Sequence, residues 1–396
     1  MLKFRVGAGL TGSSAGVDPY VYLNTMGALT NTAVIGGKAV PSIFTSAPAN
    51  IHLTWAKAFQ TNVGADLTMW GGRLRVEADL FYKYVCDIVR GVSNEYPASW
   101  GGFFFKQENG NKQDHKGFEL LVEHRNRIGD FAYRVAVSGT YTYRRWLCYS
   151  DPVNYPDYLK LTGKEVGAQV GFIAVGLFQS EEEIANSATI PGVSARPGDI
   201  RYLDRNGDGI ISYDQDRGYV AGSAYPRFQG GLSANLSWKG LDFSMNWVTG
   251  LFRTLALTGV YSSGAMDNTS MTKPFYHDGN SPFYLVENSW TETHTDARFP
   301  RLSISSPSGN NNGYSSTWWY ENGNYLRLKS AQIGCSLPRR WSEKLRMQQA
   351  RLFVEGTNLL TFSKLTKYHI DPETPGVSNG YYPQQRLFGI GLDVTF

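Results

Sequence analysis

The sequence has little charge, few cysteines and no long apolar run. Only 18% of its 396 residues are charged and the formal net charge is +4, so it lacks the basic excess typical of nucleic-acid surfaces. Cys86, Cys148 and Cys335 lie far apart and predict neither a disulfide framework nor a zinc site. No stretch approaches the roughly 18 uninterrupted apolar residues of a transmembrane helix. The opening MLKFRVGAGL also lacks the features of a signal peptide.

Motifs for bond chemistry are missing as well. The sequence contains no serine elbow, no cysteine–histidine pair and no His-Glu-x-x-His motif, and its six histidines are scattered. FRVGAGLTG at 4–12 imitates a dinucleotide fingerprint, but the SSAGVDPY that follows will not form the required helix. We therefore expect no enzyme activity, no catalytic residues and no nucleotide cofactor.

The sequence is instead rich in glycine and aromatic residues arranged with a period of two. It contains 43 Gly, 24 Tyr, 21 Phe and 10 Trp. Its last residues, QQRLFGIGLDVTF, alternate apolar with small or polar side chains, which is typical of a strand with two unlike faces. Similar alternation predicts about ten strands. They lie near 2–11, 54–69, 73–88, 116–125, 131–146, 226–237, 241–252, 324–336, 350–361 and 386–396.

The connections between these strands alternate between short and long. Short turns follow 54–69, 116–125 and 226–237, and a somewhat longer one follows 324–336. The long segments are 12–53, 89–115, 147–225, 253–323 and 362–385. Outer-membrane barrels sort their connections in this way, with short periplasmic turns and long extracellular loops. The sequence therefore predicts an all-β, antiparallel transmembrane β-barrel in the bacterial outer membrane.

In such a barrel one face of each strand meets lipid and the other faces the lumen. In the segment 73–88 the polar residues alternate with apolar ones, and we expect them to line the lumen. They are Arg73, Arg75, Glu77 and Asp79.

The stretch DRNGDGIISYDQD at 204–216 is similar to a calcium-binding loop. Its first, third and fifth positions carry carboxylate or amide oxygens, and Gly209 supplies the sharp turn. The twelfth position, where a bidentate acid is expected, is Gln215 between two aspartates. The candidate ligands for Ca²⁺ are Asp204, Asn206, Asp208, Ile210, Asp214 and Asp216. The alternative is an Asx-turn loop without metal.

Aromatic residues gather in the long connections. Flat rings beside polar residues could stack on sugars or hold peptide side chains, while packing within loops or an interfacial girdle is the alternative. The candidate substrate-binding residues are Trp100, Phe104, Trp318, Trp319, Tyr320 and Tyr381.

Four stretches together resemble the SusC/RagA-type TonB-dependent outer-membrane transporters. The first runs from PGDIRYLDRNGDG to NWVTG, ending at Gly250. The others are ENGNYLRLKSAQIGCSLPRRW at 321–341, LFVEGTNLLTFSKLTKYHIDPE at 352–373 and the terminal QQRLFGIGLDVTF. The resemblance implies that residues 1–396 correspond to about ten C-terminal strands of a barrel of about 22 strands. The plug domain and the N-terminal strands are expected to be absent, and 147–225 and 253–323 to be long extracellular loop regions.

The resemblance also implies a function and partners. The parent transporter would import glycans or oligopeptides together with a SusD-like surface lipoprotein, and it would couple to TonB through the missing N-terminal portion. Two alternatives stay open from the residues alone. One is a passive small outer-membrane barrel, porin or adhesin-like, and the other is a soluble, calcium-stapled β-sandwich that binds carbohydrate.

Overall fold

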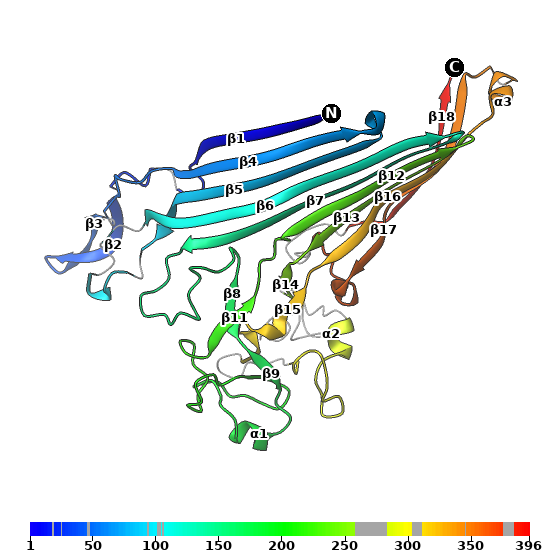
Figure 1. Cartoon of the computed structure of the whole chain (residues 1–396). Helices are drawn as coiled ribbons and strands as arrows, with labels where there is room; N and C mark the ends of the chain where they lie inside the picture. The colour runs from blue at the N-terminus through cyan, green and yellow to red at the C-terminus, as the bar shows by residue number, and fades with distance from the viewer. Residues whose placement is uncertain are drawn as a thin grey trace.

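One curved antiparallel sheet of ten strands dominates the fold (Figure 1). The computed structural model describes residues 1–396 except 18–19, 25, 46–47, 93–94, 101–103, 105–106, 258–282, 303–310, 345 and 375–383. The ten strands pair in chain order, each with the next. They are β1 (Leu2–Ser13), β4 (Ala56–Met69), β5 (Leu74–Gly91), β6 (Gln107–Ile128), β7 (Phe131–Cys148), β12 (Phe228–Trp238), β13 (Leu241–Leu251), β16 (Tyr325–Ser336), β17 (Gln349–Ser363) and β18 (Leu387–Thr395). All ten predicted strands are therefore present.

The alternation in sequence gives this sheet two unlike faces. Across neighbouring strands Val6 lies opposite Val63, Val63 opposite Leu80, and Leu80 opposite Phe118. These apolar side chains are exposed; Leu80 keeps 66% of its surface accessible. Of the fully buried hydrophobic residues in the described part of the chain, only Ala234 and Ala350 belong to the ten strands. An exposed apolar sheet face of this extent is suited to contact with lipid.

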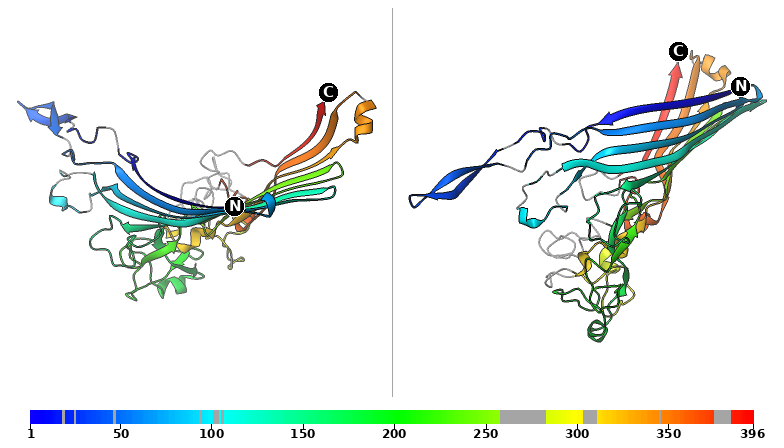
Figure 2. Two further views of the ribbon diagram at one scale, coloured as in Figure 1. Left: turned by 45° about the horizontal axis from the view of Figure 1, so that its top comes forward. Right: turned by 60° about the vertical axis from the view of Figure 1, so that its left-hand side comes forward.

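The single layer also decides between the predicted architectures. Figure 2 shows the sheet as one curved layer, with β1 and β18 at its two edges. In the described residues no second sheet packs against the ten strands, and the small sheets each contain two short strands. A soluble β-sandwich needs two sheets packed face to face. That alternative is wrong, and the predicted barrel architecture is confirmed.

The short connections lie together at one end of the sheet, and the long ones lie at the other (Figure 1). β4 joins β5 through the 3₁₀ turn η1 (Trp70–Gly72), and β16 joins β17 through α3 (Arg339–Lys344). The β12–β13 hairpin has a two-residue turn in which Lys239 and Gly240 both have positive φ, 48° and 89°. That geometry is favoured in tight hairpins and explains the Lys-Gly pair in the sequence.

Two features differ from the predicted boundaries. Strand β6 begins at Gln107 rather than near residue 116, because its polar first half pairs with β5 and β7. The segment 12–53, predicted as a loop, contains a hairpin of β2 (Met26–Ile35) and β3 (Lys38–Thr45). The hairpin projects from the long-connection end (Figure 1). A short 3₁₀ turn, η2 (Ala98–Trp100), lies between β5 and β6.

The packed hydrophobic core lies outside the sheet, in what we call the loop unit: the described parts of 149–227, 252–324 and 364–374. Its strands pair as β8 with β11, β9 with β10 and β14 with β15. Residues from all three segments meet in one core, including Phe172, Ile200, Phe299, Trp319 and Tyr368. The two long regions at 147–225 and 253–323 thus pack into a single unit.

The elements of the loop unit are short. The strands are β8 (Gln169–Phe172), β9 (Ala174–Leu177), β10 (Ile200–Tyr202), β11 (Arg217–Ala221), β14 (Thr254–Ala256) and β15 (Tyr320–Asn322). The helices are α1 (Glu181–Ala185), α2 (Phe283–Glu287), η4 (Asn311–Gly313), η5 (Thr317–Trp319) and η6 (Lys364–Tyr368). No helix in the described part of the chain is long and apolar enough to cross a membrane.

Candidate functional site

The polar face of the sheet carries paired charges. Arg5 on β1 donates to Asp66 on β4 and to Asp79 on β5, both at 2.7 Å. Gly64 lies beneath this cluster, where a Cβ atom would come within 2.1 Å of the Asp79 carboxylate. Glycine therefore leaves the room that the Arg5 and Asp79 side chains occupy on the sheet surface.

A hollow of about 490 Å³ lies on this face. Its lining spans five strands and includes Glu77, Asp79, Glu119, Ser138, Thr140 and Gln229. The Glu77 carboxylate pairs with Arg75. Glu119 is exposed and forms no ion pair in the described part of the chain. The hollow therefore presents an uncompensated negative charge to whatever fills it.

The four predicted lumen residues occupy different positions. Asp79 and Glu77 line the hollow, and Arg75 lies beside it as the partner of Glu77. Arg73 does not belong to strand β5 but follows the turn η1, where its carbonyl accepts the Arg125 N–H at 2.8 Å. Their role as lumen-lining residues stays a prediction.

A second hollow, of about 500 Å³, lies where the loop unit meets β12, β13 and β16, and its lining includes Glu165, Tyr219, Arg227, Arg253, Tyr320 and Glu321. Arg227 binds the buried Glu165 through two hydrogen bonds of 2.7 and 2.6 Å. The hydrogen bonds to Glu165 raise the pKa of Arg227 above its ordinary value. Bidentate pairs of this kind fix both side chains in place. We call this cavity the junction hollow.

The other carboxylate of the junction hollow is also fully engaged. Glu321 accepts a hydrogen bond from the Tyr368 hydroxyl and pairs with Arg298 at 3.3 Å and Lys367 at 3.7 Å. Burial alone would raise the pKa of Glu321, but the Tyr368 hydroxyl and the two cations lower it below its ordinary range. Glu321 is therefore ionised and has its counter-charges outside the hollow.

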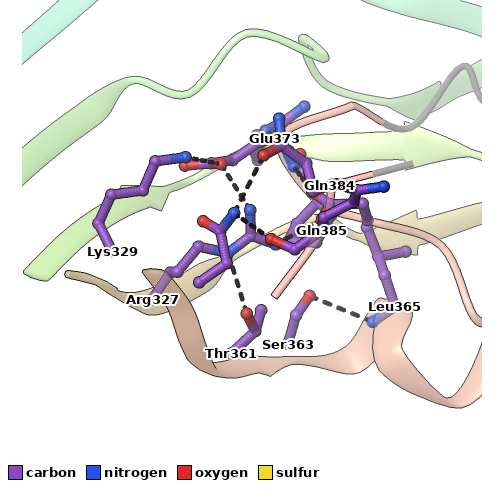
Figure 3. A network of polar contacts seen from close by, with 12 residues as sticks. Arg327, Lys329, Thr361, Ser363, Leu365, Glu373, Gln384 and Gln385 are labelled. Atoms are coloured by element: carbon purple, nitrogen blue, oxygen red, sulfur yellow. Dashed lines mark hydrogen bonds and ion pairs between the residues drawn. The ribbon is translucent and has the colours of Figure 1, made fainter. Parts of the chain in front are cut away.

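A third polar cluster fixes η6 and the residues after it to the sheet (Figure 3). Arg327 on β16 is only 2% exposed. It donates to Asp371 at 2.7 Å, to Glu373 at 2.5 Å and to Thr361 at 2.9 Å. Lys329 adds a bond of 2.8 Å to Glu373. The pair of cations in the strand YLRLKS is the sequence signal for this cluster.

The predicted calcium loop is held by its own hydrogen bonds. The Asp204 carboxylate accepts the backbone N–H of Gly207 at 2.7 Å and of Gly209 at 2.8 Å. Asn206 donates to Asp208 at 2.8 Å. Asp216 is completely buried, and its two oxygens accept the N–H groups of Arg205 and Ser212.

The predicted ligands therefore separate into two groups. Asp204, Asn206 and Asp208 lie together, with the Ile210 N–H bound to Asp208, whereas Asp216 faces the protein interior and Asp214 is exposed. In the described residues no group of three or more His, Cys, Asp or Glu side chains could hold a metal ion. Calcium binding by the loop stays a prediction.

The predicted aromatic contacts also separate. Trp100 and Phe104 both pack against Tyr96, with ring centroids 5.2 and 4.6 Å from it. Trp100 is 54% exposed, so this cluster presents an open aromatic surface. Tyr96 was missed from the sequence because an isolated tyrosine in a loop gives no pattern.

The other predicted aromatic residues are Trp318, Trp319, Tyr320 and Tyr381, and one of them is unsuited to ligand binding. Trp319 is 4% exposed and donates its indole N–H to the Asn312 carbonyl at 2.8 Å, so it belongs to the loop-unit core rather than to a binding surface. Trp318 is half-buried beside Arg298. Tyr320 lines the junction hollow. Tyr381 lies outside the described residues.

Comparison with known proteins finds relatives in sequence and in fold. No family model matches the chain. The chain is 27% identical over its whole length to TonB-dependent receptor P26 of Formosa agariphila and 25% identical to TonB-dependent receptor P3 of the same organism. Its fold matches the RagAB peptide importer in the open-open state with a TM-score of 0.69, 21% identity and full coverage of this chain. In sequence the chain is similar to TonB-dependent receptors, and its fold is that of the matched RagAB chain.

The match covers part of each relative. The chain spans 40% of the length of TonB-dependent receptor P26, 39% of P3 and 40% of the matched RagAB chain. Like the TonB-dependent receptors it resembles, the chain is an outer-membrane protein, and the exposed apolar face of its sheet is the face that meets lipid. The relatives are receptors and transporters rather than enzymes.

Proposed function

We propose that this chain is the C-terminal part of the barrel wall of an outer-membrane transporter that imports oligopeptides or glycans with TonB-derived energy. The observation that carries the proposal is the two-faced sheet, which is apolar and exposed on one side and carries a charged hollow on the other. Its strands would separate lipid from a polar import path, and no bond chemistry is required of them.

In this mechanism the residues hold a ligand and guide its passage. The loop unit would lie on the extracellular side, where the junction hollow and the aromatic cluster of Tyr96, Trp100 and Phe104 meet the ligand first. The hollow around Glu119 would then receive it on the lumen face. TonB would act on a plug carried by another part of the protein, because force on a plug, rather than on the wall, opens the path.

We also propose a SusD-like surface lipoprotein as the partner that covers the loop unit. Support comes from the similarity to the RagAB peptide importer and from the exposed apolar residues of the β2–β3 hairpin, such as Ile43 at 76%. The similarity to a peptide importer supports oligopeptides as the substrate. The exposed rings of the Tyr96 cluster are instead suited to stacking on sugars, which would support glycans.

The test is uptake by cells that carry the full-length receptor. We expect accumulation of a fluorescent oligopeptide or oligosaccharide that disappears on deletion of the receptor gene, of tonB, or of the neighbouring lipoprotein gene. The two probe classes decide between peptide and glycan. Uptake that persists without TonB would instead support the passive porin-like barrel.

For the 204–216 loop we propose a structural cation site formed by Asp204, Asn206 and Asp208. Calcium is expected to raise the thermal unfolding midpoint of the loop unit, and Asp208→Asn is expected to abolish that rise because it removes a charged ligand. Asp214→Asn is the matched control, since Asp214 is exposed and forms no hydrogen bond with Asp204, Asn206 or Asp208 in the described residues. Equal calcium responses in all three proteins, or none in the wild type, would rule the site out.

A further inference from the structure

Arg253 is a cation without a carboxylate partner among the described residues, in a hollow whose other charges are paired. It lies between β13 and β14 and lines the junction hollow. In the described part of the chain its guanidinium makes a single hydrogen bond, from Nη1 to the Pro372 carbonyl at 2.9 Å. Its Nε is enclosed and has no hydrogen-bond partner among the same residues. Burial lowers the pKa of the guanidinium, which marks it as poorly solvated.

The nearby carboxylates are already engaged. Glu165 accepts two bonds from Arg227, and Glu321 is held by Tyr368, Arg298 and Lys367. Asp371 and Glu373, on either side of Pro372, bind Arg327. No ion pair of Arg253 occurs in the described part of the chain, so its charge stays uncompensated by the protein.

The backbone of Arg253 is held in position, and the Pro372 carbonyl holds its guanidinium. Its backbone N–H donates to the Asn324 side chain at 3.3 Å, and its carbonyl accepts the Gly323 N–H at 3.0 Å. Gly323 lets the two segments approach, since a Cβ there would lie 3.1 Å from Cγ of Arg253. Among the described residues the Arg253 Nε is enclosed without a hydrogen-bond partner, and a buried N–H of a charged group is costly unless an anion completes it. A planar guanidinium is especially suited to a carboxylate, which it binds through two hydrogen bonds.

We propose that Arg253 binds a carboxylate group of the ligand in the junction hollow. The hollow, at about 500 Å³, has the size of a site for a small molecule or for the end of an oligomer. Tyr320 and the Asn322 and Asn324 amides line the same space and supply neutral hydrogen-bonding groups. The inference rests on the proposed function, because it names the chemistry of the group that the receptor captures. The terminal carboxylate of a peptide and the carboxylate of a uronic acid share this chemistry.

The experiment measures calorimetric binding to the purified full-length receptor with two matched probe pairs. One pair is N-acetyl-tetra-alanine and its C-terminal amide, and the other is tetragalacturonate and its methyl ester. We expect at least one acid to bind about tenfold or more tightly than its neutral counterpart, as a charge-assisted pair allows. The pair that shows the preference identifies the source of the carboxylate.

The variants assign the preference to one residue. Arg253→Met is expected to bring the acid-to-neutral ratio to about one, because methionine keeps much of the length without the charge. Arg201→Met is the matched control, since Arg201 pairs with Glu183 away from the hollow. If Arg253→Met does not fold, Arg253→Lys decides, because it keeps the charge but loses the fork and should lower the ratio severalfold.

Three results would overturn the proposal. They are no binding of either acid, equal binding of acid and neutral probe in both pairs, or an acid-to-neutral ratio that Arg253→Met leaves unchanged. These results differ from a failure of the proposed function. Equal binding of acid and neutral probes with uptake that still depends on TonB would remove the role of Arg253 and leave the transporter intact. Uptake that continues without TonB, together with an acid-to-neutral ratio that is lost in Arg253→Met, would instead contradict the proposed transporter and support the role of Arg253.

Discussion

Replacing Arg327 with methionine is expected to lower the free energy of unfolding by about 3–5 kcal/mol, the cost of leaving buried charges without their partner. Arg327 is 2% exposed and bridges Asp371 and Glu373 in the network of Figure 3. Its removal leaves the carboxylates of Asp371 and Glu373 without their shared partner. Among the described residues, Lys329 then remains as the cation paired with Glu373. We expect η6 and residues 371–374 to detach first, because Arg327 is their principal charged link to β16.

The measurement is a urea titration of the full-length receptor in detergent, combined with limited proteolysis of the segment after β17. Arg339→Met is the matched control, because Arg339 is 88% exposed and pairs with Glu343 on the helix surface. Such a surface pair contributes only about 0.3–0.5 kcal/mol. If Arg327→Met is no more sensitive to urea and to protease than Arg339→Met, the buried network does not hold the loop unit to the sheet.

Replacing Leu80 with arginine is expected to destabilise the folded protein in lipid by about 2–4 kcal/mol, the cost of a cation near the bilayer midplane. Leu80 lies six residues after Leu74, the first residue of β5, which is about 20 Å along the strand and, at a tilt of about 40°, about 15 Å along the membrane normal. That position is close to the middle of an apolar band about 25 Å tall. Its neighbours Val63 and Phe118 offer no counter-charge.

The control is Thr140→Arg, which places the same side chain on the opposite face. Thr140 lines the hollow and lies directly across from Glu119. An opposite charge at a cross-strand pair is neutral to slightly favourable, by about 0.2–1 kcal/mol. Guanidinium titrations after folding into lipid vesicles compare the two variants. Equal destabilisation by both would show that the apolar face of the sheet does not contact lipid.

How far the sequence predicts this fold depends on whether a segment has a periodic pattern. The ten long strands were predicted because alternation of apolar and polar residues is a local property of a two-faced strand. Where alternation fails, so did the prediction. The first half of β6, QENGNKQDH, is polar throughout, and it is a strand because partners such as Arg90 and Arg145 pair with Glu108 and Asp114. Those partners lie on other strands and cannot be found from the segment itself.

The candidate site was predicted less well, because its parts come from distant segments. The Asp-rich loop and the aromatic residues were visible as composition, but their burial was not. Trp318, Trp319 and Tyr320 are consecutive, yet Trp319 enters the core while Tyr320 lines the junction hollow. Which of three neighbouring rings meets a ligand depends on what packs against each of them. Arg253 gave no signal, since its importance lies in the absence of a partner.

The sequence by itself therefore determined the strands, their two faces and the short hairpins. These features follow from side-chain alternation and turn chemistry, which act over a few residues. Only the tertiary structure decided that the long connections share one core and which charges pair. Arg5 reaches Asp66 and Asp79, and Arg227 reaches Glu165, across some 60 to 75 positions. Such partners are fixed by register and packing, because an ion pair depends on distance in space and leaves no period in the chain.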